Sequence, residues 1–157
     1  MEYIPNGKGF LYESIKCKEN KRKNKIKYCG DFVQGKYQGD GILYYDFKEK
    51  TYYVGEFMDN KRHGNGKYYI NNKLKYDGEF KDDEYDGIGT IYYSDDSYYK
   101  GGFSNGKKNG EGKLFNRNNS IIEEGEFEDG ITPINGIIRQ ISQRQNLNEL
   151  NHTINIY

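Results

Sequence analysis

The sequence predicts an all-β protein built as an elongated, twisted antiparallel sheet of stacked β-hairpins. One observation is a repeated unit: an aromatic residue, Gly and Phe, then a polar turn, then Gly-x-Gly, recurring about every 23 residues. The other is the alternation within each unit, since Tyr53, Gly55 and Phe57 are spaced by two residues, which is the period of a β-strand. A fixed period of this size indicates an array of one small unit, and arrays mostly present surfaces to partners.

The register of the repeat is regular in the middle of the chain and degenerate at both ends. In the four complete copies, which start at Tyr28, Tyr53, Tyr76 and Tyr99, the first Gly of the pair always lies seven positions after Phe. The start of the chain keeps only the second half of a unit. Near the end, Glu123 and Ile134 replace the aromatic residue and a Gly. End units of an array are atypical because they must stop the stacking.

Each unit is predicted to form a hairpin of about 15 residues that a polar turn joins to the next. In the second copy the first strand is 53–57, the polar stretch 58–63 is the turn, and the second strand is 64–69. One hairpin alone is marginal in water, whereas five in a row bury a continuous ribbon of Tyr and Phe.

The second strand of each unit carries two apolar columns that we expect on opposite faces of the sheet. One column is Leu11, Leu43, Tyr68, Ile91, Leu114 and Ile138, and the other is Tyr12, Tyr44, Tyr69, Tyr92 and Phe115. The recurring Gly residues indicate a packing role, because each leaves a gap that an aromatic ring on a neighbouring strand can cover.

Residues 16–27 interrupt the rhythm with seven cations and one acid. One interpretation is a long, solvated hairpin loop. The other is a contact with an anionic partner, namely lipid headgroups, an acidic tail or nucleic acid. The residues of this candidate contact are Lys21, Arg22, Lys23, Lys25 and Lys27.

The array is predicted to span 1–138, and the remaining residues 139–157 form a separate tail. The tail loses the Gly rhythm and becomes rich in Gln and Asn, so a helix is permitted over about 139–151. We expect it either to cap the open sheet edge or to dock a partner.

Composition argues against several functional classes. The formal net charge is zero, which disfavours a globally basic nucleic-acid binder, and no run of about 18 apolar residues predicts a membrane span. Cys17 and Cys29 make no disulfide framework, so a reduced, cytoplasmic location is expected. His63 and His152 stand alone without ligand spacing, so no metal site is predicted.

The motifs of catalysis and cofactor binding are missing from the sequence, and we predict that the chain is not an enzyme. The Gly-x-Gly pairs lack the third Gly of a dinucleotide-binding loop, and no Gly-Lys is followed by Ser or Thr as in a P-loop. The carboxylates fall in turns or between strand aromatics, which are solvated positions rather than pocket positions. No cofactor is expected.

The repeated residues resemble MORN repeats, whose pattern is Tyr-x-Gly-x-(Trp/Phe), a turn with Gly, then Gly-x-Gly. The resemblance covers about residues 7–138, and this chain has Phe where Trp is common. It implies a twisted, elongated antiparallel sheet with a groove lined by the aromatic residues of the motif. In this sequence those residues are Tyr28, Phe32, Tyr53, Phe57, Tyr76, Phe80, Tyr99, Phe103 and Phe127. We expect Phe to support the sheet and the Tyr hydroxyl to face water or a partner's polar group.

The resemblance implies a non-enzymatic scaffold subunit that holds a peptide, a helix or a neighbouring protein subunit in this groove. Short, repeat-only chains of this kind are similar to parts of cytoskeletal and ciliary assemblies such as the radial-spoke heads of axonemes, which implies a cytoskeletal location. The alternative is a peripheral membrane tether that contacts phosphoinositides through the basic insert 16–27, and we favour it less.

Overall fold

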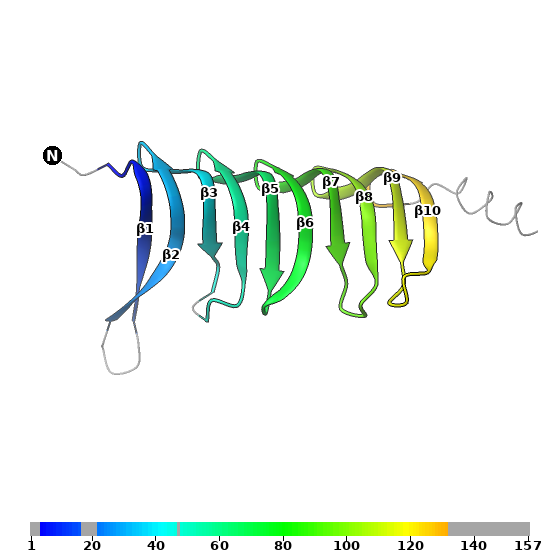
Figure 1. Ribbon diagram of the computed structural model, residues 1–157, viewed down its shortest axis with the longest axis horizontal. Coiled ribbons are helices and arrows are strands. Elements are labelled where there is room, and N and C mark those ends of the chain that lie inside the picture. Colours follow the sequence, from blue (N-terminus) through cyan, green and yellow to red (C-terminus); the bar gives the residue numbers. More distant parts are fainter. Residues whose placement is uncertain (1–3, 17–21, 47, 132–157) are drawn as a thin grey trace, which may run out of the picture.

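The computed structural model describes residues 4–16, 22–46 and 48–131, which form one ten-stranded antiparallel sheet. The strands follow one another across the sheet in sequence order, and the sheet is long in the direction perpendicular to its strands (Figure 1). The predicted all-β array of stacked hairpins is therefore confirmed, and the sheet is open rather than closed into a barrel. The predicted half-unit at 134–138 and the predicted tail helix lie outside the described residues.

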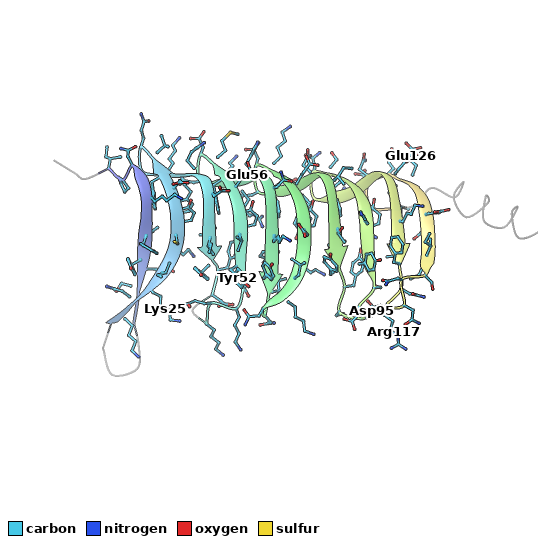
Figure 2. All side chains as sticks on the ribbon, in the orientation of Figure 1. Lys25, Tyr52, Glu56, Asp95, Arg117 and Glu126 are labelled. Carbon is cyan, nitrogen blue, oxygen red and sulfur yellow. The ribbon has the colours of Figure 1, made fainter. Side chains whose placement is uncertain are left out.

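The strands are β1 Gly7–Lys16, β2 Arg22–Val33, β3 Lys36–Tyr44, β4 Tyr52–Met58, β5 Lys61–Ile70, β6 Lys73–Lys81, β7 Glu84–Tyr92, β8 Tyr98–Ser104, β9 Lys107–Phe115 and β10 Ile121–Phe127. Among these ten strands of the described residues, each pairs only with its neighbours in the chain, so β1 and β10 have one partner strand each. Long side chains project from both faces and from both ends of the strands (Figure 2).

One long edge of the sheet, here called the turn edge, is made of two-residue hairpin turns. At Asp59 and Asn60 the backbone φ angles are 51° and 72°, the left-handed pair that a type I′ turn requires. The turn predicted from sequence, 58–63, is too long. Lys61 already belongs to β5 and Arg62 pairs with Phe57, because a type I′ turn needs only two residues to reverse the chain.

Where the structure describes both strands of a hairpin on the turn edge, a β-bulge accompanies the two-residue turn and increases the local twist of the strands. In the second unit the register shifts between Gly55 and Phe57, opposite Gly64, whose φ of 56° suits glycine. The Glu56 carboxylate supports the bulge, because its Oε1 accepts a hydrogen bond of 2.8 Å from the backbone N–H of Asn65. Glu79 does the same for Ile88 at 2.9 Å.

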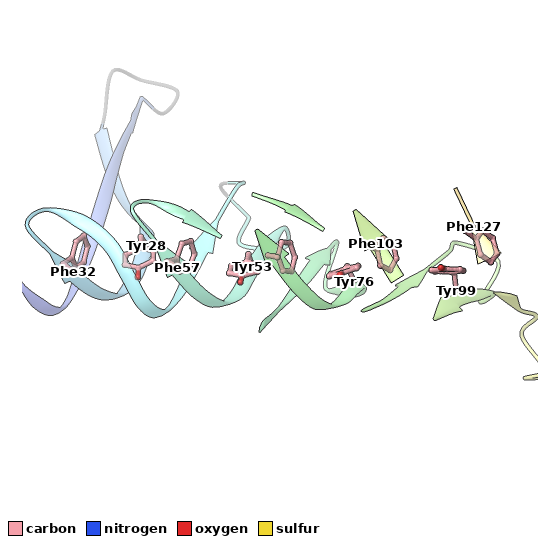
Figure 3. Close-up of a cluster of buried hydrophobic side chains, with 9 residues drawn as sticks. Tyr28, Phe32, Tyr53, Phe57, Tyr76, Tyr99, Phe103 and Phe127 are labelled. Carbon is pink, nitrogen blue, oxygen red and sulfur yellow. The ribbon is translucent and has the colours of Figure 1, made fainter. Parts of the chain in front are cut away.

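The core is a single row of aromatic rings that runs along the sheet (Figure 3). Tyr and Phe alternate, and each Tyr lies edge-to-face between the Phe of its own unit and the Phe of the next. Around Tyr53, the ring centroids of Phe57 and Phe80 lie at 5.1 and 4.9 Å. Edge-to-face pairs at this distance are favourable beyond the apolar area that they bury. We call this row the aromatic spine, and its members are Tyr28, Phe32, Tyr53, Phe57, Tyr76, Phe80, Tyr99, Phe103 and Phe127.

The paired glycines make room for the spine, which confirms the packing role predicted from sequence. Gly55 and Gly66 face each other across β4 and β5, and the Tyr53 ring lies over both. A Cβ atom on Gly66 would lie 2.2 Å from the Tyr53 hydroxyl oxygen, a distance that real Cβ atoms do not show. Glycine is therefore required at these positions for close packing rather than for an unusual backbone angle.

The basic insert is only partly a loop. Residues 22–27 belong to β2 and pair with β1, so the interpretation of 16–27 as one long solvated loop is wrong for this part. Lys23, Lys25 and Lys27 alternate with other residues. This period of two suits a strand, in which successive side chains point to opposite faces. Lys25 forms an ion pair with Glu49 and Lys27 with Glu13, each at 3.8 Å. Lys21 lies outside the described residues, and Arg22 begins β2.

Candidate functional site

The nine residues predicted to line a groove do form one continuous row, but the row is buried. Their relative exposure ranges from 0 % to 6 %, and four of them, all tyrosines, have no exposed surface. The prediction that the Tyr hydroxyls face water or a partner is wrong. Each donates a hydrogen bond of 2.9–3.1 Å to the backbone carbonyl three residues further on, as Tyr53 does to Glu56. The spine therefore supports the sheet, and its covering residues form the accessible surface.

A second row lies directly over the spine, and we call it the covering row. It consists of the residues paired across the hairpin turn with Phe32, Phe57, Phe80 and Phe103, namely Tyr37, Arg62, Tyr85 and Lys108. Aromatic and cationic side chains therefore alternate along the core face, the face of the sheet that carries the spine. The chemical pattern of this face repeats every two units rather than every unit.

The two tyrosines of the covering row stack flat on spine tyrosines. Tyr37 lies 3.8 Å from Tyr28 with the ring planes at 10°, and Tyr85 lies 3.8 Å from Tyr76 at 11°. Both tyrosines are half-buried, so one side of each ring is held by the protein and the remaining surface is open. Burial raises the pKa of each of these phenols above its ordinary value. Both therefore remain neutral donors near neutral pH.

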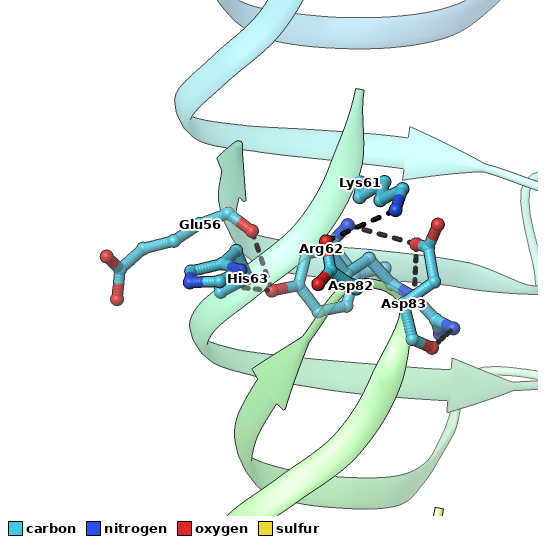
Figure 4. A network of polar contacts seen from close by, with 7 residues as sticks. Glu56, Lys61, Arg62, His63, Asp82 and Asp83 are labelled. Carbon is cyan, nitrogen blue, oxygen red and sulfur yellow. Dashed lines mark hydrogen bonds and ion pairs between the residues drawn. The ribbon is translucent and has the colours of Figure 1, made fainter. Parts of the chain in front are cut away.

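Arg62 covers the next section of the spine and is fixed by Asp83 (Figure 4). Its guanidinium carbon lies 5.0 Å from the Phe80 ring centroid and 5.8 Å from that of Tyr53, a cation–π arrangement. Its Nε donates to Asp83 Oδ1 at 3.2 Å, and a second nitrogen donates to the Asp83 backbone carbonyl. Asp83 therefore neutralises this cation, and only 17 % of the Arg62 side chain is exposed.

At the far end of the covering row, Lys108 occupies the position that is equivalent to Arg62. Its ammonium nitrogen lies 4.7 Å from the Tyr99 ring centroid and 5.4 Å from that of Tyr93. The Lys75 ammonium lies 5.2 Å from the same Tyr93 ring and donates to the Tyr92 carbonyl at 2.8 Å. Two lysines from different hairpins thus converge on one aromatic ring.

The remaining surface of the core face is apolar or aromatic. The predicted column of Leu43, Tyr68, Ile91 and Leu114 packs against the spine beside the covering row. Tyr45 stands edge-on to Tyr68 at 5.8 Å and is 42 % exposed. The core face therefore offers aromatic rings and an arginine, which are enriched among protein interface anchors, together with two lysines.

The opposite face carries the second predicted aromatic column. Tyr69 stacks on Tyr52 at 4.6 Å, and Phe115 stacks on Tyr98 at 4.7 Å. Ion pairs on this face join Lys67 with Asp77 and Lys113 with Glu124. The two columns therefore lie on opposite faces, as predicted.

The described residues offer little to a metal ion or a small substrate. No group of three His, Cys, Asp or Glu side chains among them is arranged to hold a metal ion. A shallow pocket of about 300 Å³ at the turn edge is lined by Arg62, Asp83, Glu84, Tyr85, Asn105, Gly106 and Lys107. Its central arginine and aspartate are already engaged with each other. Within the described ranges there is no helix of the length and apolarity that a membrane span requires.

Sequence reasoning missed the covering row because its members fall in stretches interpreted as polar turns. A signal for the row is present, since a Tyr, Arg or Lys occurs five residues after the Phe of each complete copy. The spacing alone could not show that these residues turn back over the core, because this depends on the shortness of the type I′ turns.

The structural repeat agrees with a comparison against known protein families. The family model described as MORN repeat matches residues 28–46, 53–74, 76–98 and 99–120, which is more than half of the chain. Each match begins at a spine tyrosine. A search of curated proteins returned no match. A MORN array is consistent with a repeat protein that binds proteins or associates with membranes, and this type of fold is a repeat scaffold not known as enzymatic. The chain therefore belongs to the MORN-repeat family.

Proposed function

We propose that this chain is a non-enzymatic scaffold subunit that holds a protein partner on its core face. The observation that carries the proposal is the covering row, in which Tyr37, Arg62, Tyr85 and Lys108 lie in line over the spine. Aromatic rings and arginine are among the side chains that most often anchor protein interfaces, and the rings supply large contact area at small entropic cost. The cytoskeletal or ciliary setting remains a prediction from the family resemblance.

The aromatic spine supports this proposal indirectly. Because the spine is buried and its hydroxyl groups are bonded internally, the residues above it are held on a rigid support. A partner that binds a pre-organised row loses less conformational freedom on the protein side, which favours affinity. The nine spine residues thus position the binding surface, and a partner would contact the residues that cover them.

The test compares partner capture by two double variants. Tyr37→Leu with Tyr85→Leu removes the exposed aromatic surface of the covering row but leaves an apolar side chain over the spine. The loss of two anchors of this kind should weaken binding by roughly 2 kcal/mol or more. The measurement is affinity capture from the native cell followed by mass spectrometry, with the captured partner then titrated against each variant.

The matched control is Tyr69→Leu with Tyr92→Leu, which makes the same chemical change on the opposite face. Thermal unfolding of all variants shows whether they remain folded. If the control pair abolishes capture and the Tyr37 and Tyr85 pair does not, the core face is the wrong surface.

The alternative, a membrane tether at the basic insert, has weaker support. Two of its candidate cations, Lys25 and Lys27, are ion-paired with Glu49 and Glu13, which lowers the charge available to lipid headgroups. Binding to anionic vesicles that is lost on changing Lys23, Lys25 and Lys27 to Ser would favour the tether over the scaffold.

A further inference from the structure

We propose that Lys75, Tyr93 and Lys108 form a receptor site for an acidic side chain, and that the partner on the core face is an acidic peptide segment. This inference rests on the proposed function, since it specifies the chemistry of the partner on the same face. The two ammonium nitrogens lie 5.2 and 5.4 Å from the Tyr93 ring centroid, so they are at most about twice that distance apart. A carboxylate placed at the edge of the ring would be attracted to both.

Lys75 and Lys108 have no acidic partner among the described residues, a property they share with exposed lysines such as Lys81 and Lys100, but they differ from those lysines in lying half-buried against aromatic rings. Lys25, Lys27, Lys36, Lys61, Arg62, Lys67, Lys107 and Lys113 all form ion pairs with carboxylates. Within the described part of the chain, neither Lys75 nor Lys108 has a carboxylate at ion-pairing distance. The carboxylate of Asp95, two residues after Tyr93 in the sequence, accepts hydrogen bonds from Ser97.

The lack of an acidic partner is significant because of where Lys75 and Lys108 lie. Both are half-buried against aromatic rings, where water screens a charge less than at a fully exposed site. An incoming carboxylate would therefore interact with these ammonium groups more strongly than with the exposed lysines of the opposite face. Tyr93 adds the positive edge of its ring and a hydroxyl group.

An acidic peptide fits this site better than a membrane surface does. Lys75 lies on β6 and Lys108 on β9, three strands apart, which corresponds to about 14 Å along the array. The strands curve around the aromatic row (Figure 3), so the core face is the inner side of the curve. A single extended chain can follow such a surface, whereas a flat bilayer cannot reach side chains that lie half-buried on it.

The experiment uses the full chain and a defined probe, an oligoglutamate of ten residues. Such a peptide extends to about 33 Å and can span the two lysine-bearing hairpins. We expect saturable chemical-shift changes at Lys75, Tyr93 and Lys108 in an NMR titration. Lys75→Gln with Lys108→Gln should raise the dissociation constant at least about tenfold, because it removes both charged hydrogen-bond donors.

The matched control is Lys81→Gln with Lys100→Gln, which removes the same charge from exposed lysines that are not ion-paired within the described residues. If both double variants weaken binding equally, the probe senses only net charge and the inference is overturned. A shift map centred elsewhere overturns it as well. Vesicles of phosphatidylcholine and phosphatidylserine that bind through Lys75 and Lys108 and displace the peptide would show that the site recognises lipid.

The outcomes also separate this inference from the proposed function. If the Tyr37 and Tyr85 variant loses its partner while the Lys75 and Lys108 variant keeps it at full affinity, the core face binds a partner but the acidic site is wrong. If the Tyr37 and Tyr85 variant keeps its partner, the proposed function itself fails.

Discussion

At the scale of single residues, each spine tyrosine and its two glycines behave as one packing unit. The Tyr53 ring fills the space above Gly55 and Gly66, and its hydroxyl group donates to the Glu56 carbonyl at 3.0 Å. The ring is thus held by contact along its length and by a hydrogen bond at its tip. A larger side chain at either glycine would therefore displace the tyrosine ring, and a larger ring would displace the glycine backbone.

We predict that Gly66→Ala destabilises the protein by about 1–3 kcal/mol, because its methyl group would overlap the Tyr53 ring. The measurement is the free energy of unfolding from a urea titration. Gly9→Ala is the matched control, since its Cβ would meet Phe32 at an ordinary contact distance of 3.4 Å. That variant should stay within about 0.5 kcal/mol of the parent.

A double-mutant cycle shows whether Tyr53 is the cause. In a Tyr53→Leu background the ring is gone, and Gly66→Ala should lose most of its cost. An unchanged cost in that background would mean that Gly66 is required for backbone approach and not for the ring.

At the scale of the hairpin, neighbouring units are joined along the turn edge by a repeated pair of contacts. The N–H of Asn60 donates to the Tyr37 carbonyl at 3.1 Å, and Lys36 pairs with Asp59 at 2.7 Å. The ion pair recurs between Lys61 and Asp82 and between Lys107 and Asp129. One place breaks the series, because Glu84 and Asn105 occupy the corresponding positions.

We predict that Glu84→Lys with Asn105→Asp completes the series and stabilises the protein by about 0.2–1 kcal/mol. Aspartate is compatible with this turn position, since Asp59 and Asp82 adopt φ angles of 51° in equivalent turns. The gain should shrink at high salt, because the pair is exposed. Urea titrations of the double and both single variants give the coupling energy, and a coupling of zero at low salt would contradict the prediction.

The sequence was sufficient to predict the hairpins, their order and the two faces, because Gly and aromatic residues recur in a period-two pattern. It was sufficient to predict a buried ribbon of Tyr and Phe as well, but not to show that other side chains cover this ribbon, so that its residues line no accessible groove and its hydroxyl groups bond internally. That error arose at Arg62 and its equivalents, which were interpreted as turn residues. Their return over the core depends on two-residue turns and on bulges at positions such as Gly64, which are set by backbone geometry rather than by composition.

At the scale of the whole molecule, stability depends on tyrosine in the place of aliphatic residues. Four of the nine spine residues are tyrosines with no exposed surface. Burial raises the pKa of Tyr99 to about 12 and raises the pKa of Tyr28, Tyr53 and Tyr76 further. A phenol with a raised pKa in the folded state stabilises that state only while it stays protonated.

We predict that the protein unfolds cooperatively in alkaline solution. Above pH 10 the tyrosines of the unfolded chain lose protons while those of the spine keep them, so stability falls as pH rises. The stabilising contribution is complete below pH 10 and is lost as pH rises towards and through the folded-state values. Circular dichroism should show loss of β-structure in the same pH range in which the spine tyrosines ionise. Their ionisation is measured by the absorbance of tyrosinate.

The comparison of circular dichroism with tyrosinate absorbance decides whether the spine tyrosines are protected. If all 17 tyrosines ionise as one class near pH 10 while the β-structure persists, the spine is not protected as described. A first group of exposed tyrosines that ionises without unfolding is expected and serves as the internal reference.

The open order of the sheet has a mechanical consequence. Because each strand is bonded only to its chain neighbours, a load applied through β1 and β10 would act on one strand at a time, peeling it from the end of the array. Peeling breaks backbone hydrogen bonds in sequence rather than together, so the force needed should be low and should rise and fall once per unit. Each released unit of about 23 residues would lengthen the chain by roughly 65 Å, the extended span less the width of two strands. A protein with this property would lengthen stepwise under load rather than resist it as a rigid body.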